Sequence, residues 1–184
     1  MNRQNNPLGI NRMTSYIALL RAVNVGGTGK LAMSDLVALC KKVGFANPRT
    51  YIASGNVLFE SRLPEPKVKA TLEKHLAAFT GKPAQILVRT AAEMAAVVAA
   101  NPFPDCAPNR TVAIFLNAAP PADTLRHITG KADEEIQLGV REIYVHYGSG
   151  MAKTKLKIPA AKTGTGRNMN TVAKLTQMAA KMKG

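Results

Sequence analysis

The chain has 184 residues, of which 46% are hydrophobic and 20% charged, a composition typical of globular proteins and unlike that of disordered ones. No apolar run reaches the roughly 18 residues of a membrane span, so the sequence predicts no membrane contact. The formal net charge of +14 excludes a neutral surface and favours anionic partners.

The positive charge is concentrated in two parts of the sequence. Residues 15–90 carry 11 basic and 4 acidic side chains (net +7), and residues 91–150 carry 4 and 7 (net −3). Residues 151–184 carry 8 basic side chains and no acidic one (net +8). This asymmetry predicts a positive field over part of the surface, which would attract anions. A solvated lysine surface that keeps the protein in solution explains the same numbers.

The beginning of the chain and the cysteines bear on the compartment. Residues 1–13 are polar, lack the apolar stretch of a secretion signal and predict a disordered N-terminal extension. Met13 directly precedes the first predicted strand and is a second candidate for the initiator. Cys40 and Cys106 form no CxxC pair, which fits a reducing, cytoplasmic compartment. Cys40 falls on a predicted apolar helix face and is expected to be a buried small hydrophobe.

The first half, residues 14–100, predicts the order β-α-β-β-α-β followed by a further helix. Strands are predicted at residues 15–20, 49–53, 57–59 and 84–89, and helices at residues 34–43, 64–80 and 90–100. The apolar face of the second helix is expected to hold Val68, Leu72, Leu76 and Phe79. This element order is that of a ferredoxin-like fold.

The second half, residues 110–184, repeats this order in part after a proline-rich linker at residues 102–109. Strands are predicted at residues 111–117, 135–138 and 142–147, a short helix near 122–128, a loop over 148–166 and a helix at about 170–183. The chain is therefore expected to be an α+β protein of two similar ferredoxin-like β-α-β-β-α halves, a duplicated architecture.

A glycine-rich loop follows the first predicted strand and contains Arg21, Asn24, Gly26, Gly27 and Lys30. Consecutive glycines let backbone N–H groups converge on an anion, and the lysine adds charge. The loop matches neither a Walker A motif nor the dinucleotide-binding G-x-G-x-x-G pattern. An anion site and a turn that needs positive φ angles are both consistent with these residues.

The last predicted helix is preceded by Arg167 and Asn168, with Asn170 at its start. Asparagine is a good N-cap, and a helix N-terminus attracts anions through its unpaired N–H groups. Arg167 would add a bidentate grip on phosphate or carboxylate. Ordinary helix capping explains the same residues.

Two further segments are weaker candidates for ligand contacts. The alternating lysines at 153, 155 and 157 predict a mobile positive patch with Lys155 at its centre, or simply a solvated loop. The turn that contains Ser54 and Asn56 is explained by a hairpin, and a ligand contact through either side chain is the alternative.

Signatures of catalysis are sparse. None of the three histidines is paired with a cysteine, an aspartate or a second histidine at the spacing typical of metal ligands. The sequence also contains no nucleophile elbow. The sequence therefore predicts no metal site and no cofactor, and it designates no catalytic residue. The low aromatic content argues against proteins that stack on nucleic-acid bases.

Three segments in order, residues 16–30, 49–59 and 153–175, resemble the bacterial domain-of-unknown-function 1697 family. The resemblance runs from near Met13 to the C-terminus. The matching positions are Arg21, Asn24, Gly26, Gly27, Lys30, Ser54, Gly55, Asn56, Lys155, Arg167, Asn168, Asn170 and Thr171. The chain departs from the family pattern at Ala22-Val23 (usually Gly-Ile), Ala53 (usually Gln), Gly166 (usually Thr) and Met169 (usually Trp). The resemblance implies a cytoplasmic α+β protein of two similar halves and no known substrate.

Three functions remain consistent with the sequence. The first is a module that binds a phosphate-bearing or other anionic ligand, including the backbone of a nucleic acid. The second is an enzyme acting on a small phosphorylated or carboxylated metabolite, and the third is a structural or interaction protein with no ligand. The first two require the glycine-rich loop and Arg167 to be neighbours in space. The sequence does not define the oligomeric state.

Overall fold

The computed structural model describes residues 12–23 and 31–182. The first half contains β1 (Thr14–Leu20), α1 (Met33–Lys42), β2 (Ala46–Thr50), β3 (Asn56–Ser61), α2 (Glu65–Thr80), β4 (Ile86–Thr90) and α3 (Ala91–Ala99). The second half contains β5 (Thr111–Phe115), the 3₁₀ helix η1 (Thr124–His127), β6 (Glu134–Leu138), β7 (Glu142–Tyr147), the 3₁₀ helix η2 (Pro159–Ala161), β8 (Thr165–Asn168) and α4 (Met169–Ala180).

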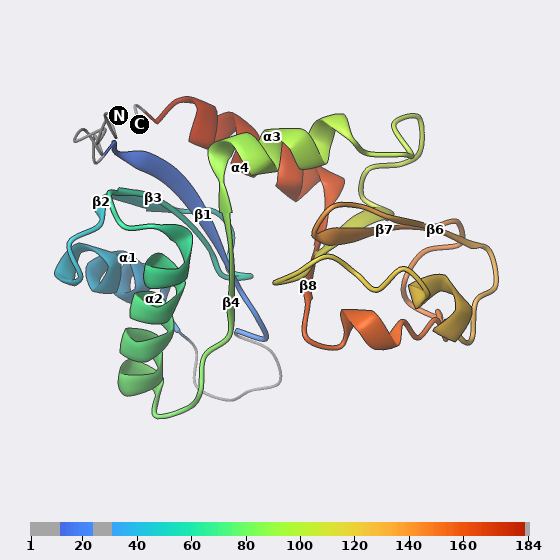
Figure 1. Ribbon diagram of the computed structural model, residues 1–184, viewed down its shortest axis with the longest axis horizontal. Helices are drawn as coiled ribbons and strands as arrows, with labels where there is room; N and C mark the ends of the chain where they lie inside the picture. The colour runs from blue at the N-terminus through green and yellow to red at the C-terminus, as the bar shows by residue number, and fades with distance from the viewer. Residues whose placement is uncertain (1–11, 24–30, 183–184) are drawn as a thin grey trace, which may run out of the picture.

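The two halves share one sheet topology. The strand orders are β2-β3-β1-β4 and β6-β7-β5-β8, and every neighbouring pair is antiparallel. The strands of the second sheet thus occupy the positions of those in the first, in the same chain order. Figure 1 shows the two sheets side by side, and the last strand of each is followed by a helix, α3 or α4. The expected duplicated α+β fold is confirmed, with η1 and η2 where the first half has α1 and α2.

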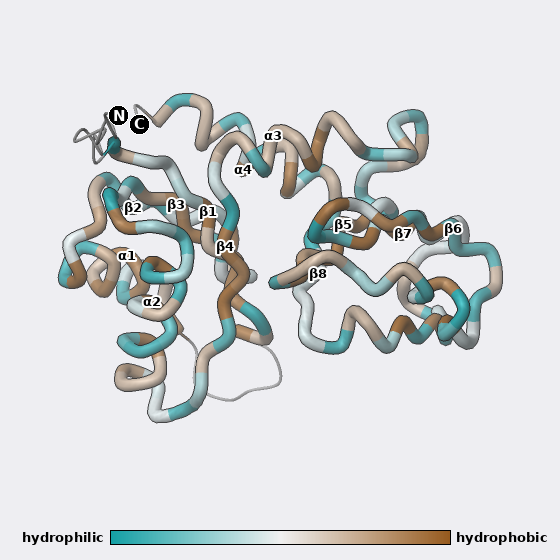
Figure 2. Tube along the Cα trace, viewed as in Figure 1, coloured by the Kyte–Doolittle hydropathy of each residue, from teal (hydrophilic) through white to brown (hydrophobic). Residues whose placement is uncertain are grey.

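The central strand β1 is apolar throughout because both of its faces are covered. Tyr16, Ala18 and Leu20 pack into the core under α1 and α2, whereas Ile17 and Leu19 face α3 and α4. Burial on both faces explains why this strand is a continuous apolar run rather than an alternating one. In Figure 2 the hydrophobic segments follow β1 and β4.

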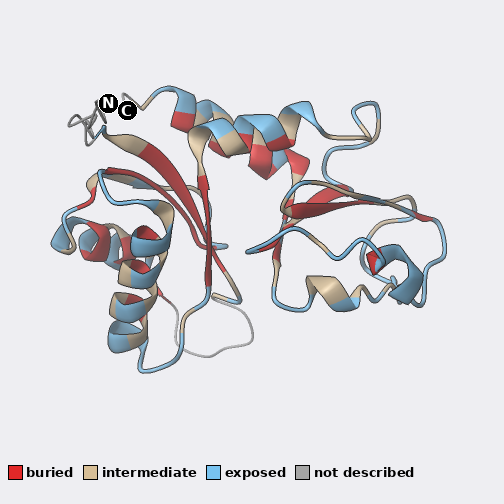
Figure 3. Cartoon of the chain, viewed as in Figure 1, coloured by how far each residue is buried: buried red, intermediate tan, exposed pale blue. Residues whose placement is uncertain are grey.

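Helices α3 and α4 form a layer that belongs to both halves. Met94 of α3 and Val172 of α4 share one core with Leu87 of the first sheet and Phe115 of the second. Figure 3 shows buried residues along the strands of both sheets and on parts of these two helices. The two halves are therefore joined by a common hydrophobic core as well as by the chain.

Several details differ from the sequence predictions. β8, which was not predicted, begins at the end of the segment expected to be a loop (residues 148–166) and extends beyond it, because pairing with β5 stabilises a sequence of low strand propensity. The strand predicted at residues 49–53 is β2, which begins earlier, at Ala46. Phe79, expected on the buried face of α2, is 57% exposed. The predicted N-terminal extension and most of the glycine-rich loop fall in residues 1–11 and 24–30, outside the described residues.

Candidate functional site

The guanidinium of Arg167 crosses from the second half into the first. Arg167 lies in β8 and is 8% exposed. Its Nε donates to Oδ1 of Asn56 at 2.6 Å, and its Nη2 donates to the carbonyl oxygens of Leu20 at 3.0 Å and Ser54 at 3.1 Å. Its Nη1 donates to Thr165 Oγ1 and to the Gly166 carbonyl in its own strand. These bonds use all five N–H groups of an arginine side chain.

The hairpin turn before β3 and the first residue of β3 supply two of the five acceptors for Arg167, from Ser54 and Asn56. Gly55 adopts a φ of +82°, and a Cβ there would lie 2.9 Å from that of Leu20, so the turn needs glycine for both reasons. Asn56 is fully buried, and its Nδ2 donates to the Tyr51 carbonyl and to Ser54 Oγ. These bonds fix the amide so that its oxygen faces Arg167.

Arg21 crosses the junction in the opposite direction, from the end of β1 into the second half. Its Nε donates to the Gly164 carbonyl at 3.2 Å, and its Nη2 to the Lys162 carbonyl at 2.6 Å. Its Nη1 donates to Oε1 of Gln85. Hydrogen bonds within the described part of the chain thus use three of its five donors, and the side chain is only partly buried.

Within residues 12–23 and 31–182, no acidic group pairs with either of these two arginines. Every hydrogen-bond acceptor of Arg21 and Arg167 is a carbonyl, an amide or a hydroxyl oxygen. Burial lowers the pKa of Arg167 to about 10, so the side chain is still positive at neutral pH. A guanidinium held in this way keeps its full positive field, which favours an anion nearby.

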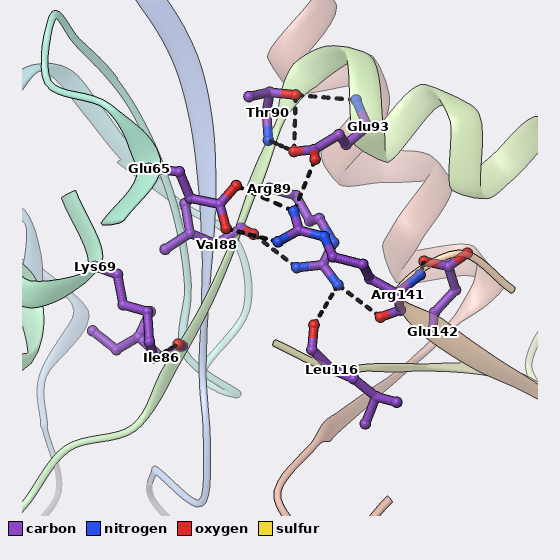
Figure 4. A network of polar contacts seen from close by, with 10 residues as sticks. All are labelled: Glu65, Lys69, Ile86, Val88, Arg89, Thr90, Glu93, Leu116, Arg141 and Glu142. Carbon is purple, nitrogen blue, oxygen red and sulfur yellow. Dashed lines mark hydrogen bonds and ion pairs between the residues drawn. The ribbon is translucent and has the colours of Figure 1, made fainter. Parts of the chain in front are cut away.

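In a second cluster at the same junction, the arginine is paired with carboxylates (Figure 4). Arg141, in the turn between β6 and β7, donates to both carboxylate oxygens of Glu65 at 2.9 and 3.1 Å and to Glu93 at 2.8 Å. Bonding to Glu65 raises the pKa of Arg141. The cluster joins α2, α3 and the second half through opposite charges, so it is suited to holding the halves together.

Glu93 also caps α3. The Thr90 Oγ1 accepts from the Glu93 N–H, and the Glu93 carboxylate accepts from the Thr90 N–H at 2.8 Å, which completes a capping box. Burial alone would raise the pKa of Glu93, but the bonds from Thr90 and the charge of Arg141 outweigh it, and the pKa is lowered.

Arg89 completes the cluster from β4. Its guanidinium, 2% exposed, donates to the Val88, Leu116 and Arg141 carbonyls and lies 5.4 Å from the centre of the Phe115 ring. Burial, together with the nearby charge of Arg141, lowers its pKa. Arg89 therefore ties the edge of the first sheet to the end of β5.

Arg21 lines one hollow, and its hydrogen-bond partner Gln85 lines a second one as well. One, of about 130 Å³, is lined by residues that include Arg21, Lys82 and Gln85, together with apolar side chains. The other, of about 410 Å³, lies between the halves and is lined by residues that include Gln85, Asn117 and Thr163.

Lys69 and Glu73 line the larger hollow, but their polar atoms are engaged. Glu73 Oε1 accepts the Ile86 N–H at 3.0 Å, and Lys69 Nζ donates to the Ile86 carbonyl and to Glu73. These bonds satisfy the outward backbone groups of the edge strand β4. The pair is therefore explained by the fold.

The structure brings together some of the sequence-predicted site residues and separates others. Arg21, Ser54, Asn56 and Arg167 meet at the junction. Asn168 caps α4 through the Thr171 N–H at 3.0 Å, and Asn170 is exposed on that helix. Lys155 lies against Gly130, and its neighbour Lys157 pairs with Thr129, close to η1. Asn24, Gly26, Gly27 and Lys30 lie outside the described residues.

The sequence led us to expect that Arg167 contacts the ligand directly, but its hydrogen bonds in the structure oppose this role. Each of its five donors is bound inside the protein, so contact with an anion would require one of those bonds to break. The side chain leaves from β8 and not from the N-terminus of α4, where the sequence pattern had suggested it.

Sequence reasoning missed Gln85, Arg89 and Arg141. A signal existed for Arg89, since an arginine within the apolar run Ile86–Thr90 must either point to solvent or be compensated inside. No comparable signal marks Gln85 or Arg141, because their partners come from distant parts of the sequence.

The described residues contain neither a metal-binding cluster nor a membrane-spanning helix. Within residues 12–23 and 31–182, no three His, Cys, Asp or Glu side chains are grouped so that they could hold a metal ion. Over the same ranges, no helix has the length and apolar character needed to cross a membrane.

The fold and this junction define a class: a duplicated ferredoxin-like α+β protein in which an arginine of each half donates hydrogen bonds to backbone carbonyls of the other half. The chain belongs to the family described as "Protein of unknown function (DUF1697)", which it matches over residues 13–144. It is similar to a solved structure described as that of the conserved bacterial protein SP0830 from Streptococcus pneumoniae, with 26% identity and a TM-score of 0.77. That similarity covers 91% of this chain and 99% of the other. No curated protein matches.

Proposed function

We propose that the protein binds a small anionic ligand at the junction of its two halves, with Arg21 as the principal contact. The proposal rests on how many N–H groups of the Arg21 side chain are already hydrogen-bonded. The side chain is held in place by three neutral acceptors, and two of its N–H groups have no acceptor among the described residues. An oriented guanidinium with two donors left is suited to a carboxylate or phosphate group.

Arg167 has a positioning role in this proposal. Its Nη2 bonds the carbonyl of Leu20, the residue directly before Arg21, and that of Ser54. It also adds a buried positive charge that is bonded by no carboxylate of the described part of the chain. Ser54 and Asn56 act through Arg167 by holding it. The glycine-rich loop with Asn24, Gly26, Gly27 and Lys30 remains a further candidate for ligand contacts.

A small molecule is favoured over the backbone of a nucleic acid. The hollow that Arg21 lines and the second hollow, lined by its partner Gln85, have small-molecule dimensions, at about 130 and 410 Å³. The exposed lysines at 153, 155 and 157, which would suit a nucleic-acid backbone, lie near η1 rather than beside Arg21. Residence in the cytoplasm, expected from the two unpaired cysteines, belongs to the same proposal.

Isothermal titration calorimetry with inorganic phosphate at low ionic strength tests the proposal. Arg21→Gln should weaken binding about tenfold or more, because a hydrogen bond to a charged group contributes about 1.5–3 kcal/mol. The matched control is Arg110→Gln, which removes an exposed arginine bonded to the Gly148 carbonyl. Equal losses in both variants, or no heat of binding in the unmodified chain, would remove the proposal.

A further inference from the structure

The lining of the hollow of about 130 Å³ beside Arg21 combines cationic and apolar side chains. Building on the proposed function, we propose that the ligand is an acid with a compact apolar body. Its carboxylate or phosphate ester group contacts Arg21, and its apolar body fills the hollow.

The apolar wall comes from core residues of the first half. Leu76 of α2 and Leu31 before α1 are 1% and 4% exposed and line the hollow together with Leu20, Val23 and Ala84. The small remaining exposure of these side chains is what a ligand would cover. Apolar atoms placed against them leave water, which is favourable.

The polar residues of the lining supply positive charge and hydrogen-bond donors. Arg21 and Lys82 are cationic, and Gln85 orients Arg21 through Oε1 while its amide nitrogen offers further N–H groups. No aspartate or glutamate is among the described residues that line this hollow. A cationic or neutral ligand would not compensate the positive charges of Arg21 and Lys82, so the lining favours an anion.

The volume limits the size of the apolar body. About 130 Å³ is slightly less than the roughly 150 Å³ of a cavity that takes up benzene. The body is therefore about the size of one phenyl ring or a short alkyl chain. Inorganic phosphate has no apolar group to displace water from the apolar residues of the hollow. A nucleic-acid backbone likewise has no group that would fill the hollow.

Calorimetric titration of the full chain with acetate, butyrate, hexanoate and octanoate tests this. Affinity should rise about fourfold per added methylene as far as hexanoate, and then level off once the hollow is full. Phenyl phosphate should likewise bind more tightly than inorganic phosphate, and its comparison with benzoate shows which acid group is preferred. Affinities that do not change with chain length would overturn the inference.

Variants separate this inference from the proposed function. Ala84→Leu extends an apolar side chain into the hollow and should lower the ratio of hexanoate to acetate affinity about tenfold or more. If that variant does not fold, as judged by circular dichroism, Val23→Met serves the same purpose. An unchanged ratio in a folded variant contradicts the inference. Phosphate binding lost in Arg21→Gln but without any chain-length effect would leave the proposed function standing and refute the inference alone.

Discussion

Arg21 and Arg167 cross the junction between the two halves in opposite directions, each bonding backbone carbonyls of the other half. Arg167 Nη2 donates to the Leu20 carbonyl at 3.0 Å, and Arg21 Nε donates to the Gly164 carbonyl at 3.2 Å. Neither arginine has a carboxylate partner among the described residues. Their hydrogen bonds therefore hold the two halves together and also concentrate positive charge at the junction. Stability and the proposed anion binding therefore depend on the same contacts.

Removing the Arg167 guanidinium should be strongly destabilising. Arg167→Met keeps the apolar stem but leaves the Asn56 amide oxygen and the Leu20 and Ser54 carbonyls without their donor. We expect a loss of about 3 kcal/mol or more in the free energy of unfolding, measured with urea. The control Arg126→Met changes an exposed arginine and should cost less than about 0.5 kcal/mol.

Arg167 and Asn56 should be energetically coupled. A double-mutant cycle with Arg167→Met and Asn56→Ala should give a coupling of about 1–3 kcal/mol, since both single changes break the same 2.6 Å bond. Additive effects would show that the two side chains act independently.

Gly55 should tolerate alanine less well than Gly81 does. Both have positive φ angles, +82° and +71°, but a Cβ at Gly55 would lie 2.9 Å from that of Leu20, whereas nothing lies within 4 Å at Gly81. Gly81→Ala should cost about 1 kcal/mol from backbone strain alone. Gly55→Ala should cost about 2 kcal/mol or more, because overpacking is added. Thermal unfolding of the two variants provides the comparison.

The pKa of Glu93 should make stability depend on acid pH. Because its pKa is lower in the folded chain than its ordinary 4.5, the carboxylate stabilises the fold above pH 4.5, and this contribution is lost as the pH falls through the folded-state pKa. Urea unfolding between pH 7 and pH 3 should show a smaller pH dependence for Glu93→Gln than for the parent. Glu135→Gln, at an exposed position, is the control.

The two cysteines should differ in reactivity. Burial raises the pKa of the Cys40 thiol to about 12, and the side chain is fully buried, so it should be alkylated only when the chain unfolds. Cys106 is partly exposed and should react in the native protein. Mass spectrometry of each thiol after iodoacetamide treatment, with and without denaturant, distinguishes the two rates.

Local sequence patterns were enough to predict most of the fold. The strand predicted at residues 15–20 and the helices predicted at 64–80 and 90–100 each depend on neighbours in sequence, and the structure has β1, α2 and α3 there. β8 was missed because its residues become a strand only through pairing with β5. Tertiary pairing outweighs intrinsic propensity in such cases.

The site was predicted only in part for a similar reason. The residue types of Arg21 and Arg167 suggested anion contacts, but how many of their donors are engaged depends on carbonyls of the opposite half. That count is what separates the two roles. Arg167 is saturated by internal acceptors, whereas Arg21 keeps donors that a ligand could bond.

The central claim is that an anion binds at Arg21, and a crystal structure of the full chain grown with phosphate tests it most directly. We predict density for phosphate within hydrogen-bonding distance of the Arg21 guanidinium, with the bonds from Arg167 to Leu20 and Asn56 intact. Phosphate bound only along the lysines at 153, 155 and 157, with none at Arg21, would contradict the account.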